Sequence, residues 1–173
     1  MFCIRYPPFR DTKGDIQESS LIGFNDYIDN LEPIIIVMFT EEQKEAVFQK
    51  CRTINGMSPK LWRLDSSGAI IKKTSYGRDD DLYGWEIDHV IPRSILDKYN
   101  VPKDLQNDLT NLRAMNWNNN ASKGDSYPSY EIVVTSEDDG NSNTFTVGSR
   151  TVNHKLQERL QSLFGDYINF DEL

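Results

Sequence analysis

Cysteine and histidine are scarce in this chain of 173 residues, which contains two of each. Cys3 and Cys51 lie far apart, so they can build neither a disulfide framework nor a Cys-x-x-Cys zinc clip. Long apolar runs are also lacking. The longest, residues 34–39, is too short to span a bilayer, and the first residues have no apolar signal core. We therefore expect a soluble, intracellular protein of one compact domain with decorated ends.

Positive charge is in short supply, because 19 Lys and Arg face 27 Asp and Glu, a formal net charge of -8. That total argues against a nucleic-acid ligand, since neutralising phosphates requires clustered cations. The distribution argues otherwise. Seven Lys or Arg and a single Asp lie between Lys50 and Arg78, whereas acidic residues gather after residue 130. The basic stretch could hold a phosphate backbone, and the acidic C-terminal region could bind a protein partner or a second copy of the chain.

Hydrophobic patterning and turn residues predict a mixed α+β chain. Thr40-x-x-Gln43 has the form of a capping box, and it predicts a helix that runs to about Thr53. Asn116 is a natural N-cap for a short helix that Gly124 would end. The other expected elements are a short helix at 21–31, strands at 34–37, 61–64, 69–73, 85–91, 130–135 and 143–147, one or two helical turns at 94–99, and a C-terminal helix at 151–164.

Two segments near the middle of the chain carry the chemistry. Trp-Glu-Ile-Asp88-His89-Val-Ile-Pro92 precedes Asn111-Leu, which leads into Asn120-Ala-Ser-Lys123-Gly-Asp. Asp88 and Asn120 offer the oxygen ligands that Mg²⁺ prefers, His89 can accept a proton near neutral pH, and Lys123 could meet a phosphate oxygen. Neighbours on a strand point to opposite faces, so Asp88 and His89 can share a site only where the strand twists or ends.

These residues, in this order, resemble the HNH endonucleases over roughly residues 83–126. The resemblance implies a ββα-metal (His-Me finger) core in which two strands and a helix surround one divalent ion. It makes Asp88 and Asn120 the metal ligands and His89 the general base. Asn111 would brace the loop that carries the histidine. Three features depart from the family: asparagine stands at the last motif position, the cysteine pairs of many relatives are missing, and the segment from Arg93 to Asp108 replaces the usual short Gly-rich link.

The resemblance also implies a cofactor and a substrate. Mg²⁺ is the expected ion, with Mn²⁺ or another divalent ion as substitutes, and DNA is the expected substrate, cut to a 5′-phosphate and a 3′-hydroxyl. We expect an arm at 1–40, a nuclease domain at 41–130 and a C-terminal hairpin plus helix at 131–173. A bacterial or phage-infected cell is the expected setting, with a nuclear location left open. The candidate substrate contacts are Lys72, Lys73, Arg93 and Arg113.

Several readings stay open on sequence grounds. Asn116 could be a third metal ligand, although the cap is favoured, and Glu86 could tune the metal or form a salt bridge. A nucleic-acid-binding or assembly module on the same core, without cleavage, is the main alternative function. A toxin-type nuclease is a third, which the net charge of -8 disfavours.

Overall fold

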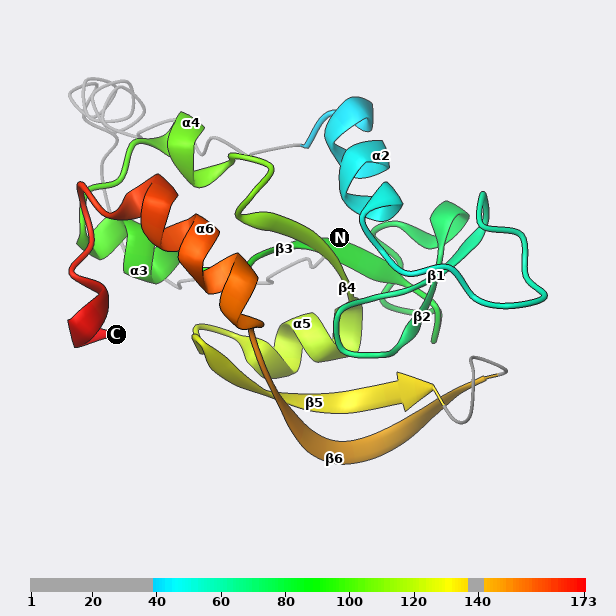
Figure 1. Ribbon diagram of the computed structural model, residues 1–173. Helices are drawn as coiled ribbons and strands as arrows, with labels where there is room; N and C mark the ends of the chain where they lie inside the picture. The colour runs from blue at the N-terminus through cyan, green and yellow to red at the C-terminus, as the bar shows by residue number, and fades with distance from the viewer. Residues whose placement is uncertain (1–38, 137–141) are drawn as a thin grey trace, which may run out of the picture. The chain divides into compact units, whose positions relative to one another are not determined.

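The structure is a computed structural model that describes residues 39–136 and 142–173 (Figure 1). The expected arm, the helix at 21–31 and the strand at 34–37 lie outside these residues, apart from the last two residues of the arm. Residues 39–173 form one compact unit of mixed α+β structure. Its elements are α2 (Glu41–Gln49), β1 (Trp62–Leu64), β2 (Ile70–Lys72), η1 (Lys73–Ser75), β3 (Trp85–His89), α3 (Arg93–Lys98), α4 (Lys103–Gln106), β4 (Leu112–Asn116), α5 (Trp117–Lys123), β5 (Ser129–Ser136), β6 (Asn143–Thr151), α6 (His154–Phe164) and η3 (Phe170–Glu172).

Helix α2 begins as the sequence predicts. The Thr40 hydroxyl accepts the Gln43 amide proton, and the Gln43 side chain accepts the Thr40 amide proton, so the capping box is confirmed. Val47 and Phe48 are fully buried. The helix ends at Gln49, earlier than the expected Thr53. Its buried face covers one side of the β3–β4 pair.

Strands β1 and β2 form the predicted hairpin, with Leu64 opposite Ile70. The turn between them is organised by Asp65, which is 1 % exposed. Its Oδ1 accepts the amide protons of Ser67 and Ala69, and its Oδ2 accepts the amide proton of Asn116. One buried carboxylate therefore ties this hairpin to the end of β4, where α5 begins.

The centre of the unit is an antiparallel pair, β3 and β4, followed directly by α5 (Figure 1). The register places Trp85 opposite Asn116 and His89 opposite Leu112. Asn116 is the N-cap of α5, as predicted, because its side-chain oxygen accepts the Asn118 amide proton. One face of the pair packs on Val47 and Phe48 of α2. Side chains alternate between the two faces of a strand, so those of Glu86 and Asp88 lie on the opposite face of the pair, toward α5.

The polar segment between β3 and β4 contains two short helices, α3 and α4, where the sequence predicts only one or two turns at 94–99. Lys103–Gln106 is too short to show a helical pattern in the sequence. The side chain of Gln106 donates to the Val101 carbonyl and to Asp97. This segment is thus ordered by its own polar contacts and returns the chain to Asn111 beside β3.

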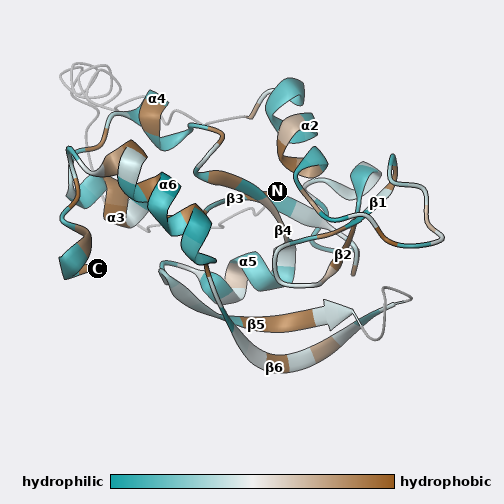
Figure 2. Ribbon diagram, in the orientation of Figure 1, coloured by the Kyte–Doolittle hydropathy of each residue, from teal (hydrophilic) through white to brown (hydrophobic). Residues whose placement is uncertain are grey.

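The C-terminal part packs against α5 and α3. Asn119 of α5 pairs with the β5 backbone, donating to the Val134 carbonyl and accepting the amide protons of Val133 and Val134. Helix α6 starts after its N-cap Asn153, three residues later than expected, and buries Leu160 and Phe164. Figure 2 shows α6 as mostly hydrophilic, with hydrophobic positions at helical spacing. In the described part of the chain, no helix is long and apolar enough to cross a membrane.

Candidate active site

The structure brings the central motif residues to one place. Asp88 and His89 from β3, together with Asn120 and Lys123 from α5, line an open hollow of about 170 Å³. Arg93 of α3 and Asp125 lie at the same hollow. Although Asp88 and His89 alternate in direction, His89 is the last residue of β3, so the end of the strand lets both reach the hollow.

Asp88 is 5 % exposed and is held by two cations. Its Oδ2 accepts the Nε proton of Arg113 at 2.7 Å across the sheet, and its Oδ1 lies 3.0 Å from the Lys123 Nζ. A carboxylate has about four lone-pair positions, so these contacts leave acceptor capacity on both oxygens. The pairing also explains how a buried carboxylate is tolerated here.

Lys123 is 2 % exposed and its ammonium is fully engaged. Besides Asp88, its Nζ donates to the carbonyls of His89 and Gly124. Burial lowers the pKa of the Lys123 ammonium, and Asp88 opposes that shift. The sequence suggested a cation free to meet a phosphate oxygen, but the folded chain uses Lys123 to hold Asp88 and the end of β3.

His89 is half-buried beside the Phe39 ring, with 5.8 Å between ring centroids. Its Nε2 lies 2.9 Å from the Oδ1 of Asn107. Because a carbonyl oxygen can only accept, Nε2 carries the proton in this contact and the lone pair lies on Nδ1. Burial lowers the pKa of His89 below its ordinary value, and the Asn107 contact partly opposes the shift. The imidazole is therefore neutral at pH 7 and can act as a base.

Asn111 is fully buried and fastens the segment that follows His89. Its Oδ1 accepts the Ile91 amide proton, and its Nδ2 donates to the carbonyls of Ile91 and Gln106. Its backbone carbonyl accepts the Val90 amide proton. These contacts are the kind of brace that the resemblance assigns to Asn111, and they hold the loop that follows His89.

Asn120 is oriented by Glu86. The Asn120 Nδ2 donates to the Glu86 carboxylate at 2.7 Å, which leaves the Asn120 Oδ1 as a neutral oxygen donor. Glu86 and Asp88 lie two residues apart on β3 and so share the face toward α5. Asn116, by contrast, is fully buried and its amide donates to the carbonyls of Leu82 and Gly84, which supports the cap rather than a third ligand.

The oxygen donors suit a hard divalent ion. Asp88, Asn120 and Glu86 supply carboxylate and amide oxygens only, a set that favours Mg²⁺, which keeps several of its waters. Among the described residues, no group of three or more His, Cys, Asp and Glu side chains could hold a metal ion. The proposed ligand set contains only two such side chains, Asp88 and Glu86, and its third member is the amide of Asn120. The types of oxygen in this set are those that magnesium prefers. The charge of Asp88 is, however, already balanced by Lys123 and Arg113.

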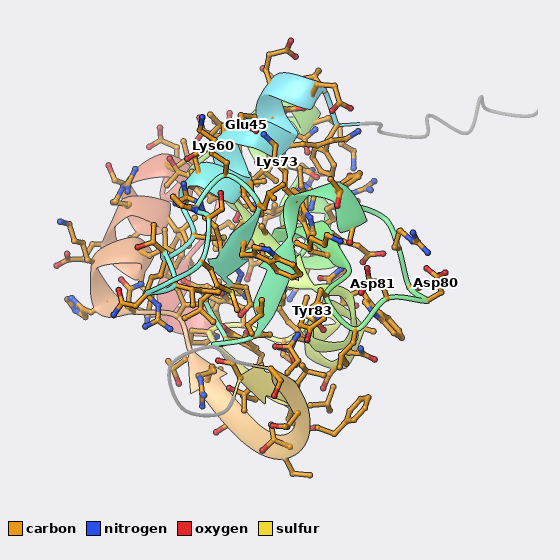
Figure 3. All side chains as sticks on the ribbon, turned by 90° about the vertical axis from the view of Figure 1, so that its right-hand side faces the viewer. Glu45, Lys60, Lys73, Asp80, Asp81 and Tyr83 are labelled. Carbon is orange, nitrogen blue, oxygen red and sulfur yellow. The ribbon has the colours of Figure 1, made fainter. Side chains whose placement is uncertain are left out.

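The remaining expected substrate contacts lie apart from the hollow, with the exception of Arg93. The Lys72 ammonium lies over the Trp62 ring at 5.4 Å. Lys73 pairs with Glu45 of α2 at 2.6 Å; both side chains are labelled in Figure 3. Arg113 is buried beside Asp88 and does not line this hollow. Of the four, only Arg93 is both exposed and at the hollow.

Sequence reasoning missed Asn107 and gave Arg113 another role. Asn107 lies in a polar segment without periodicity, and no local signal marks it as the partner of His89, 18 residues away. Arg113 was named as a candidate substrate contact, whereas its position opposite Asp88 emerges only from the strand register. Comparisons with family models, with curated proteins and with solved structures found no match to this chain.

Proposed function

We propose that this chain is a metal-dependent endonuclease of the HNH kind, with β3, β4 and α5 as its ββα-metal core. The observation that carries the proposal is the meeting of Asp88, His89 and Asn120 at one hollow, from two elements far apart in sequence. Three chemically distinct groups that a phosphodiester hydrolase needs are thereby available at a single place. The order of the motif residues along the chain adds to that support.

His89 is the general base of the proposed reaction. Its Nδ1 accepts a proton from the attacking water, while Asn107 fixes the ring through Nε2. The lowered pKa keeps the imidazole unprotonated at neutral pH, so the base is ready without further tuning. Asn111 and Lys123 act as positioning residues, because they fasten the backbone at Ile91 and at the His89 carbonyl.

Asp88 and Asn120 would hold the divalent ion, with Glu86 orienting Asn120 through its amide. Mg²⁺ is the ion proposed, and Mn²⁺ is a natural substitute because both favour oxygen ligands. When bound, such an ion supplies positive charge against the phosphate oxygens and the leaving alkoxide. Arg93, exposed at the same hollow, would contact the DNA backbone.

DNA is the proposed substrate, with a 5′-phosphate and a 3′-hydroxyl as products.

One observation favours the alternative, a nucleic-acid-binding or assembly module that does not cleave. Both oxygens of Asp88 already meet cations, so a divalent ion would have to share that carboxylate with Lys123 and Arg113. A structural role for Asp88 would produce the same contacts.

Supercoiled plasmid distinguishes the two functions. The full chain is incubated with plasmid and Mg²⁺ or Mn²⁺, with EDTA as the metal-free arm and His89→Ala as the variant. Nicked or linear plasmid that requires the metal and disappears in the variant supports the nuclease. Intact plasmid that is retained tightly by the wild-type chain supports the binding module and rejects catalysis.

A further inference from the structure

A second cavity, of about 450 Å³, is lined by Lys50 after the end of α2 and by residues of β4, β5 and the start of α6. Four of the residues that line it are cationic: Lys50, Arg113, Lys155 and Arg159. Of the described residues that line it, none is Asp or Glu. In a chain with a net charge of -8, a cavity walled by cations without a carboxylate needs an explanation.

Arg113 adds positive charge to the wall of this cavity. Its Nε pairs with Asp88 and its Nη1 donates to the Tyr130 hydroxyl at 3.1 Å. Its Nη2 has no hydrogen-bond partner among the described residues, but this atom is buried and is not open to the cavity. Arg113 itself is 9 % exposed, so solvent screens its charge only weakly.

The Nζ of Lys50 donates to the backbone carbonyls of Leu109 and Leu112, which leaves one N–H for a ligand. Burial lowers the pKa of the Lys50 ammonium and Arg159 adds to the effect, with Asp108 opposing it. Lys155 and Arg159 lie four residues apart on α6, so they share one helical face and repel each other. Neither forms an ion pair with any described residue.

The start of α6 adds to this electropositive wall. The 11-residue helix has no acidic residue in its first turn, and Lys155 occupies that turn. The positive end of a helix favours anions and disfavours cations, so Lys155 is placed where its charge is least stable. Hydroxyl groups of Thr110, Thr151 and Tyr130 lie around the same cavity and can donate hydrogen bonds.

We propose that this cavity is a binding site for a phosphate group, held by Lys155, Arg159 and the remaining N–H of Lys50, with the positive charge of Arg113 in the wall. Phosphate offers several acceptor oxygens and up to two negative charges, which suits a cavity whose described lining residues include four cations and no carboxylate. The volume lies within the range of small-ligand sites. The phosphate comes either from a nucleic-acid backbone or from a free phosphorylated molecule. Binding at this cavity does not depend on the proposed nuclease activity.

Inorganic phosphate tests the site directly. Calorimetric titration into the full chain, without divalent metal, should show saturable binding at about 1 mM or tighter. The double variant Lys155→Gln/Arg159→Gln should weaken it at least about tenfold, since two cations are removed. The control Arg52→Gln/Lys60→Gln makes the same charge change at exposed positions outside the cavity. Binding that fails to saturate, or equal weakening in both double variants, overturns the proposal.

A second arm identifies the source of the phosphate and locates it. If the cavity variant weakens binding of a short DNA duplex more than the control variant does, the site takes a backbone phosphate. If it weakens inorganic phosphate alone, the site takes a free anion. In either case the Arg113 Nε–H resonance should shift on phosphate addition, and an unmoved resonance at saturation overturns the assignment. Loss of plasmid nicking would leave these results unaffected, because no metal or cleavage enters the measurement.

Discussion

Asp88 and Arg113 form an ion pair across β3 and β4, with 2.7 Å between Oδ2 and Nε, and both side chains are almost fully buried. Lys123 meets the other carboxylate oxygen. Asp88 therefore has two tasks in the proposed enzyme: it holds two cations in the fold and offers its remaining lone pairs to a divalent ion. Substitutions here change stability and activity together, so both have to be measured.

Arg113→Met tests the structural task. The substitution leaves Asp88 with Lys123 alone and removes a buried partner, which should lower the free energy of unfolding by about 3–5 kcal/mol. Urea denaturation followed by circular dichroism measures the change. Arg52→Met is the matched control, because Arg52 is exposed and forms no ion pair with a described residue. A loss below about 1 kcal/mol for Arg113→Met would show that the pair is not structural.

Removal of Asn107 tests the orientation of the histidine. Asn107→Ala leaves the His89 ring without its acceptor at Nε2, so the rate of nicking should fall about 10- to 100-fold while duplex binding is kept. Nitrogen NMR of the ring should show the Nε2–H tautomer in the wild type and a mixture in the variant. An unchanged tautomer together with an unchanged rate would remove Asn107 from the account.

The acid limb of the pH–rate profile reports His89. Because burial lowers its pKa, the imidazole stays neutral to a lower pH than a free histidine, and the rate should fall only below about pH 6.5. The same shift affects the free energy of unfolding. The part of it that comes from the neutral His89 is fully present above about pH 6.5 and is lost as the pH falls through the lowered pKa of the folded state. An acid limb above pH 7 in a plasmid assay would contradict the proposed base.

Asp65 connects the first hairpin to the candidate site. Asp65→Ala deprives three buried amide protons of their acceptor, those of Ser67, Ala69 and Asn116, and should cost about 3 kcal/mol or more. Asp79→Ala, in an exposed loop, is the control and should change stability by less than about 0.5 kcal/mol. Thermal denaturation of both variants measures the difference. Equal melting temperatures would show that the carboxylate does not support the fold.

Local signals in the sequence predicted much of the fold. The capping box at Thr40, the cap at Asn116 and the hairpin around residues 65–68 are each determined by neighbours within a few residues, and all three are confirmed. The start of α6 was placed too early, because Thr151 continues β6 and Asn153 is the cap that begins the helix. The mixed α+β class was predicted from the hydrophobic patterns typical of helices and of strands, both of which occur along the sequence.

The candidate site could be predicted only in part. The motif named Asp88, His89, Asn120 and Lys123, and the structure gathers them at one hollow. What each side chain contacts depends on register and on chain reversals, which no local pattern reports. The pairing of Arg113 with Asp88 needs the alignment of β3 and β4. The contact of Asn107 with His89 depends on the path of the polar segment between β3 and β4, because the two residues are 18 positions apart in the sequence.

The central claim is that Asp88, Asn120 and the His89 loop surround one divalent ion, and paramagnetic NMR tests it most directly. Substoichiometric Mn²⁺ is added to the isotope-labelled full chain, and the broadening of each backbone amide is recorded, with Asn120→Ala as the variant. The account predicts that broadening centres on residues 86–90 and 120–125 and disappears in the variant. Broadening centred elsewhere, or unchanged in Asn120→Ala, would contradict it.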